Sequence, residues 1–240
     1  MKLSCTLIVS LLSLLIASLG WGTGESISST PMVEIPAGSY IPLYTTDKTP
    51  RKVEAFRIDT LPVSKKQFLA FVTTNPKWQR SNVSPIFADK TYLQDWKSDK
   101  NPGSAIESPV TNISWFAARA YAAHVGKRLP TVDEWEFIAR ADATKANATA
   151  EDSYTQTILE WYAAPNKSPL PQANTFPKNF YGVQALHGLI WEWNEDFNNS
   201  MVTGESRGDT GIERNLFCAG GAVSSTDVRN YAAFMRYAFR

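Results

Sequence analysis

Apolar side chains recur at helical spacing between residues 115 and 125 of this chain. Ser114, directly before them, is a residue type that caps the N-termini of helices. Gly126, directly after them, supplies the left-handed position that commonly ends a helix. The apolar positions on the shared face are Trp115, Ala118, Ala122 and Val125. The pattern therefore predicts a helix from Trp115 to about Val125.

Two further helices are predicted from their capping boxes. Thr131 and Glu134 form a Thr-x-x-Glu box, which predicts a helix over residues 132–141. A Ser-x-x-Gln box opens a helix over residues 64–73, whose buried face carries phenylalanine and valine. These helices share the chain with apolar segments that read as strands.

The remaining pattern predicts short strands and long loops. Residues 33–41 and 52–58 read as two strands that flank a turn rich in proline and threonine. We expect residues 75–107 to be irregular, residues 141–155 to form a polar surface loop, and the chain to be irregular again after Ile158. Helices and strands in this order predict an α+β fold with little regular secondary structure.

Composition supports one compact domain. The chain has 240 residues, 43% of them hydrophobic and 12% aromatic, which is enough to bury a sizeable core. The formal net charge is +1 and no basic stripe is visible, so we expect no nucleic-acid partner.

The first 22 residues have the pattern of a signal peptide. Lys2 supplies the positive start, an apolar run follows, and small residues offer cleavage positions. The alternative is a membrane anchor, but the run is short for a span and contains serine and threonine. We therefore expect residues 1–22 to be cleaved, residues 23–30 to form a linker, and residues 31–240 to form a periplasmic or secreted domain without a stable membrane anchor.

Three sequence blocks resemble the formylglycine-generating-enzyme, or sulfatase-modifying-factor, family. Residues 109–140 are similar to its block PVSWxxAxAYCxWxGKRLPTExEWEYAAR, residues 179–193 to NxxGLxDMxGNVWEW, and residues 217–222 to RGGSW. The resemblance covers roughly residues 31–240 and implies a C-type-lectin-like α+β fold. The family normally continues into a last strand, whereas this chain ends at Arg240. Either this homologue trims that strand or the gene product is truncated.

The resemblance also identifies what catalytic members need. They hold copper(I) with two cysteines that follow the double glycine, because this soft ion favours sulfur ligands. In this chain the two positions fall at about Ser225 and near Ala232, so copper and formylglycine synthesis by that mechanism are not expected. Cys218 is the only cysteine after the signal peptide, so no internal disulfide is expected. It is either a lone reactive thiol or, as its apolar neighbours favour, a core residue.

A second branch of the family uses three histidines to hold iron. This chain has only His124 and His187, which are far apart in sequence. His187 lies within the turn of the second block and reads as structural, with catalysis as the alternative. Another metal-dependent oxidoreductase remains an open hypothesis, with Glu192, Asp196, His187 or Cys218 as ligands.

Calcium is the cofactor that the resemblance implies. The family's turn binds it through a side-chain oxygen, two main-chain carbonyls and a glutamate, which suits a hard cation. Here Glu192 keeps the glutamate, and Gly188 and Ile190 supply the carbonyls, but Ala185 replaces the first side-chain ligand. Asn174 matches a position of a second calcium site whose acidic loop is shortened. We expect at most a calcium site with fewer carboxylates than in the family.

A ligand groove is predicted around Trp191, Trp193, Asn194, Gly220 and Gly221, with aromatic walls and main-chain donors. The alternative is that the tryptophans, Trp191 above all, belong to the core. The leading hypothesis is an exported family member without the copper pair, which acts as a binding or maturation accessory for a secreted enzyme or metabolite. Its partner would be an exported protein or a small molecule. The alternative is a formylglycine-generating, sulfatase-activating oxidase or another oxygen-using enzyme.

Overall fold

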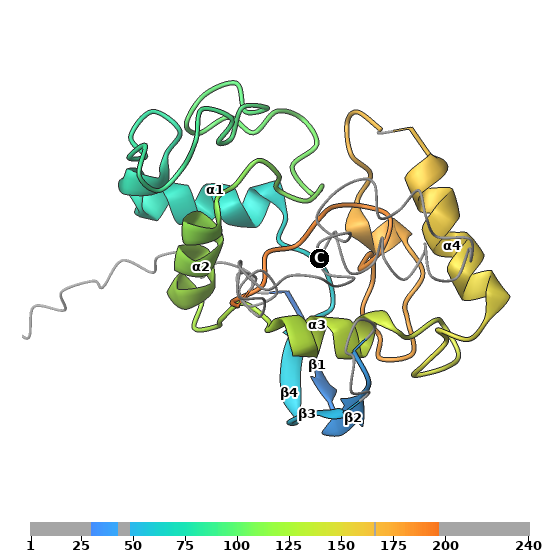
Figure 1. Ribbon diagram of the computed structural model, residues 1–240. Helices are drawn as coiled ribbons and strands as arrows, with labels where there is room; N and C mark the ends of the chain where they lie inside the picture. The colour runs from blue at the N-terminus through green and yellow to red at the C-terminus, as the bar shows by residue number, and fades with distance from the viewer. Residues whose placement is uncertain (1–29, 43–48, 166, 197–240) are drawn as a thin grey trace, which may run out of the picture.

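The computed structural model describes residues 30–42, 49–165 and 167–196 (Figure 1). In this part the chain is a mixed α and β structure, as its sequence pattern predicts. The predicted signal peptide, residues 23–29 of the predicted linker, and the predicted site residues Cys218, Gly220 and Gly221 lie outside the described residues.

Four short strands form two antiparallel pairs in the described residues. The strands are β1 (Met32–Ile35), β2 (Gly38–Tyr40), β3 (Arg51–Val53) and β4 (Phe56–Asp59). β1 pairs with β4 and β2 pairs with β3. The prediction of two long strands was wrong, because each is interrupted. Pro36 separates β1 from β2, since proline has no N–H to continue a ladder.

The helices are α1 (Lys65–Thr74), η1 (Pro76–Trp78), α2 (Trp115–His124), α3 (Val132–Ala139), α4 (Asp152–Ala163) and η2 (Ala173–Thr175). Both predicted capping boxes, at Ser64 and Thr131, are formed, and Gly126 has φ +71°. The predictions of a loop up to residue 155 and of irregular chain after Ile158 were wrong, because α4 spans both. In the described part of the chain, no helix has the length and apolar character that a membrane span requires.

Of the hydrophobic cores in the described residues, the two largest are built on α2 and on α3, and a smaller one lies around Ala173, Ala185 and Leu189. The first, which we call the α1–α2 core, lies between α1, α2 and the long loop after η1. Its buried members are Phe68, Phe71, Val72, Trp78, Tyr92, Leu93, Trp96, Val110, Ala117 and Tyr121. The second core joins α3 to the strands, and its buried members are Ile35, Tyr40, Val53, Trp135, Phe137, Ile138, Ala139, Val183 and Leu186.

The helix faces follow from these cores. α2 buries Tyr121 together with three alanines, whereas Trp115, predicted on the buried face, is only half-buried. Trp115 donates its Nε1–H to the carbonyl oxygen of Asn194, near the end of the described chain. Figure 1 shows that end, in orange, beside the connection from α2 to α3.

Candidate functional site

Residues 191–196, which we call the groove segment, are fixed by hydrogen bonds from three tryptophan indoles. Trp135 on α3 donates its Nε1–H to Glu192 Oε2 at 2.7 Å. Trp115 at the start of α2 donates to the carbonyl oxygen of Asn194 at 2.9 Å. Trp193 donates from the groove segment itself to the carbonyl oxygen of Ile113 at 3.0 Å. The segment is thus tied to both helices by side chains that the sequence blocks place there.

The acidic end of the groove segment completes the start of α3. The Glu195 N–H donates to the Pro130 carbonyl at 2.8 Å, and Asp196 Oδ1 accepts from the Val132 N–H at 2.8 Å. A carboxylate at this position satisfies a free N–H and suits the positive end of the helix dipole. Glu195 also pairs with Arg119 at 3.1 Å. Asp196, a candidate metal ligand, therefore has a structural role here.

Within the groove segment, Glu192 has a carboxyl group whose pKa is shifted far from its usual value. The residue keeps part of its surface exposed, but its carboxyl group lies within the protein. Burial raises the pKa of Glu192 to about 7, although the hydrogen bond from Trp135 lowers it in part. A carboxyl group that takes up a proton near neutral pH is common at functional sites.

The predicted groove residues separate into exposed and buried members. Trp191 is 64% exposed and Trp193 is 39% exposed, so the alternative that Trp191 belongs to the core is wrong. Asn194 is fully buried, and within the described part of the chain neither its Oδ1 nor its Nδ2 has a hydrogen-bond partner. An unpaired buried amide costs stability and is therefore a feature to explain.

His187 contacts groups on α3 and α4. Its Nε2 lies 2.8 Å from the Ala139 carbonyl and 3.4 Å from the Tyr154 hydroxyl. Its ring meets the rings of Trp135 and Tyr154 edge to face. These contacts join the end of α3 to α4 and support the structural reading. Sequence reasoning missed Tyr154 because it placed no helix there.

The predicted calcium residues are brought near one another only in part. Gln184, which sequence reasoning missed, donates its amide to the carbonyls of Asn174 (3.2 Å) and Phe176 (2.6 Å), so η2 lies against the turn. Gly188 has φ +91°, and an added Cβ would come within 3.2 Å of the Trp161 ring. Ala185 is buried with φ +60°, a conformation that asparagine tolerates better than alanine.

The residues of this turn supply fewer carboxylate ligands than a calcium site usually has. Within the described residues, no group of three or more histidine, cysteine, aspartate or glutamate side chains is placed to hold a metal ion. Glu192 supplies the one carboxylate of the predicted set, and one of its oxygens already accepts from Trp135. A hard cation with few carboxylates is held weakly.

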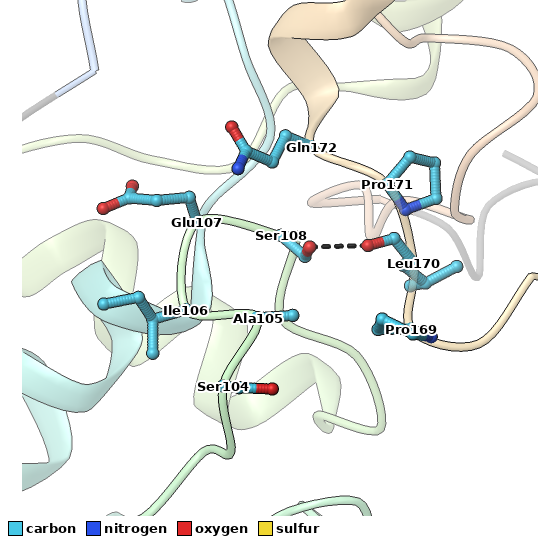
Figure 2. Close-up of a pocket in the computed structure, with 9 residues that line it drawn as sticks. All are labelled: Ser104, Ala105, Ile106, Glu107, Ser108, Pro169, Leu170, Pro171 and Gln172. Atoms are coloured by element: carbon cyan, nitrogen blue, oxygen red, sulfur yellow. Dashed lines mark hydrogen bonds between the residues drawn. The ribbon is translucent and has the colours of Figure 1, made fainter.

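A cavity of about 340 Å³ lies apart from the predicted site residues (Figure 2). Its walls are residues 104–108 and 169–172, joined by a 2.6 Å hydrogen bond from Ser108 Oγ to the Leu170 carbonyl. Glu107 pairs with Lys66 at 3.0 Å. The lining offers neither a nucleophile beside a base nor a second carboxylate, so it does not support a catalytic site.

Comparison with known proteins identifies the domain. The model of the sulfatase-modifying factor enzyme 1-like domain matches residues 22–240. The inactive C-alpha-formylglycine-generating enzyme 2 of Bos taurus is 30% identical over 253 residues, covering 80% of this chain and 79% of that protein.

Two other relatives are covered less completely. The formylglycine-generating enzyme of Thermomonospora curvata is 30% identical over 198 residues, which is 61% of each chain. The serine/threonine-protein kinase pkn1 of Chlamydia caviae is 27% identical over 148 residues, which is 60% of this chain but 23% of the kinase. The chain thus spans less than two thirds of both proteins.

Proposed function

Because this chain belongs to the family of the sulfatase-modifying factor enzyme 1-like domain, we propose that it is an exported binding protein without copper–thiolate chemistry. It would serve as an accessory in the maturation of a secreted enzyme or metabolite. We further propose that its α+β domain has the C-type-lectin-like fold that the family resemblance implies. Export to the periplasm or the medium is part of the proposal.

The cysteine content carries this proposal. Cys5 and Cys218 are the only cysteines among 240 residues, and Cys5 lies in the predicted signal peptide. A two-thiolate copper(I) site needs two, and neither serine nor alanine replaces a thiolate as a ligand for this soft ion. A relative that spans most of this chain is named as inactive, which agrees with a role other than catalysis.

The groove segment supports a binding role. Trp191 and Trp193 expose aromatic surface on either side of a carboxyl group that is held in place by Trp135. Exposed indoles on a fixed backbone provide contact area at a low cost in side-chain entropy, which is typical of recognition sites. The ligand would be an exported protein or a small molecule with apolar surface.

An aldehyde assay tests the proposal. Purified protein is incubated with oxygen, copper and a peptide that carries Cys-x-Pro-x-Arg, the motif that catalytic family members recognise, and aldehyde is captured with a hydroxylamine probe. We expect no aldehyde from either the wild type or the matched Cys218→Ser variant. Aldehyde formation by the wild type that is lost in Cys218→Ser would overturn the proposal.

Metal analysis of the same preparation separates the two classes of function. Calcium alone, or no metal, agrees with a binding protein. Copper or iron bound in stoichiometric amounts would instead support a metal-dependent oxidoreductase.

Calcium binding is a second part of the proposal, limited to a weak site. Glu192 and the carbonyls of Gly188 and Ile190 would hold the ion, with Asn174 at the neighbouring position. Calcium would supply positive charge that fixes the turn.

The variant Ala185→Asn tests this site, because it adds a side-chain oxygen at a position where asparagine tolerates φ +60°. We expect calcium to raise the melting temperature of Ala185→Asn more than that of the wild type. Equal responses of the two proteins would contradict a site at this turn.

A further inference from the structure

Four aromatic rings form a continuous strip across three segments of the chain, which we call the aromatic strip. Trp78 of η1 contacts Phe87 of the following loop, with ring centroids 6.0 Å apart. Phe87 contacts Phe116 at 5.3 Å, and Phe116 contacts its neighbour Trp115 on α2 at 5.3 Å. The edge-to-face geometry of the last two pairs is a favourable arrangement that fixes the rings relative to one another.

The middle of the aromatic strip is open to solvent. Phe87 and Phe116 are each 44% exposed, and Ile86, which precedes Phe87 in the chain, is 81% exposed. Apolar side chains exposed singly are ordinary, but two exposed rings in contact form an apolar surface that a partner can cover. Held rings of this kind are typical of the residues that dominate protein–protein binding.

Each end of the aromatic strip carries a cation. The Lys77 ammonium lies 5.7 Å from the centroid of the Trp78 ring, and the Arg119 guanidinium lies 5.2 Å from that of Trp115. Lys77 forms no ion pair with any residue in the described ranges. Arg119 pairs with Glu195, but its side chain is still 58% exposed. The strip is therefore an apolar surface between two accessible positive charges.

We propose that the aromatic strip binds a protein segment in which an apolar side chain stands between two carboxylates. The apolar side chain would cover Phe87 and Phe116, and the carboxylates would face Lys77 and Arg119. This inference does not depend on the proposed function, because its central rings, Phe87 and Phe116, lie outside the groove segment. One end of the strip meets that segment, through Trp115 with Asn194 and Arg119 with Glu195.

A narrow segment fits the strip better than a flat anionic membrane does. Phe87 and Phe116 are half-buried and turned toward each other, so neither ring protrudes far enough to insert into lipid.

Peptide binding by fluorescence anisotropy tests the inference. The probe is fluorescein-labelled Gly-Glu-Leu-Trp-Glu-Gly, compared with Gly-Lys-Leu-Trp-Lys-Gly, at low ionic strength where surface charges are least screened. We expect the acidic peptide to bind more tightly, and Phe87→Ser or Phe116→Ser to weaken it about tenfold or more. Lys77→Gln should weaken it about threefold, since it removes one cation and leaves the rings.

Phe180→Ser is the matched control, because Phe180 is 54% exposed and lies outside the strip. We expect it to bind the acidic peptide as the wild type does, and circular dichroism confirms that each variant is folded. Equal binding of the two peptides, no binding of either, or an equal loss in Phe180→Ser would overturn the inference.

Two further outcomes would replace the inference with another partner. One is binding to phosphatidylserine vesicles, but not to the peptide, that is lost in Phe87→Ser. The other is a dimer in analytical ultracentrifugation that is lost in Phe116→Ser. The aldehyde assay is independent of all these measurements, so failure here is distinguishable from failure of the proposed function.

Discussion

The α1–α2 core and the groove segment adjoin the same helix, α2, but are held in opposite ways. In the core, Phe68, Phe71 and Tyr121 meet ring against ring, with centroids 5.4 to 5.8 Å apart. In the groove segment, indole N–H groups bind single oxygens, and a carboxyl group and an amide are buried among them. The core is stabilised by apolar burial, while the groove segment depends on the direction of a few hydrogen bonds.

The groups that reduce stability are concentrated in the groove segment. Apolar burial stabilises a domain without requiring any particular chemistry on its surface. A buried carboxyl group and an unpaired amide reduce stability, and natural proteins tend to accept such costs at functional sites. The groove segment, rather than the core, is therefore the region to examine for function.

Phe68→Ala should have the largest effect and should leave the groove segment unchanged. Phe68 is fully buried and contacts three aromatic rings, so its truncation should lower the free energy of unfolding by about 3–5 kcal/mol. Urea denaturation measures this. Phe180→Ser, at an exposed ring, should change stability by less than about 0.5 kcal/mol. A small effect of Phe68→Ala would show that the core repacks.

Glu192→Gln should reveal the cost of the buried carboxyl group. The pKa of Glu192 is raised to about 7 in the folded protein, so the folded state binds this proton more tightly than the unfolded state does. The stability that this proton confers is complete below the unfolded pKa near 4.5 and is lost as the pH rises to about 7. Glutamine mimics the protonated group and can still accept from Trp135.

The variant should therefore match the wild type at acid pH and exceed its stability by up to about 3 kcal/mol above pH 7. Thermal unfolding over a pH series measures the difference between the two proteins. If the difference in stability between the two proteins is the same at every pH of the series, Glu192 does not titrate in this range.

The helices and their caps could be predicted from sequence because their causes are local. Ser64 and Thr131 bond to backbone three residues away, and Gly126 needs only its own conformation. The strands and α4 could not be predicted from sequence, because the residues at which they begin and end depend on tertiary contacts. α4 has no side-chain cap hydrogen bond at Glu151, and its buried Tyr154 contacts Ala139 and His187, which are 15 and 33 positions away.

Asn194→Leu tests whether the buried amide is kept for function. Leucine has the same branching and number of side-chain heavy atoms and leaves no unpaired donor or acceptor, so it should raise stability by about 1–2 kcal/mol where the site takes its larger methyl groups. The hydrogen bond from Trp115 is made to the backbone carbonyl and should survive. Chemical denaturation measures the change. A loss of stability would mean that the amide has a partner in the folded protein.

The candidate site could be predicted only as a set of residue types. The sequence blocks place Glu192 and Trp193 in one segment, and both side chains make hydrogen bonds that hold this segment. They did not reveal that Trp115 and Trp135 are donors that hold the segment, because these contacts join residues that are 79 and 57 positions apart. They also did not reveal that Asn194 is buried, since burial is decided by packing.

Trp115→Phe should have the smallest effect and the most local one. Phenylalanine keeps a ring on α2 but removes the N–H that bonds to the Asn194 carbonyl, which should cost about 1 kcal/mol. Because that bond holds the groove segment, the Glu195 N–H, which bonds to Pro130, should exchange with solvent faster. Trp193→Phe is the control, since its bond to Ile113 is more exposed and should matter less. Native-state hydrogen exchange distinguishes the two variants. Faster exchange throughout the α1–α2 core of Trp115→Phe would show that the two regions are stabilised as one unit, which contradicts the contrast drawn between them.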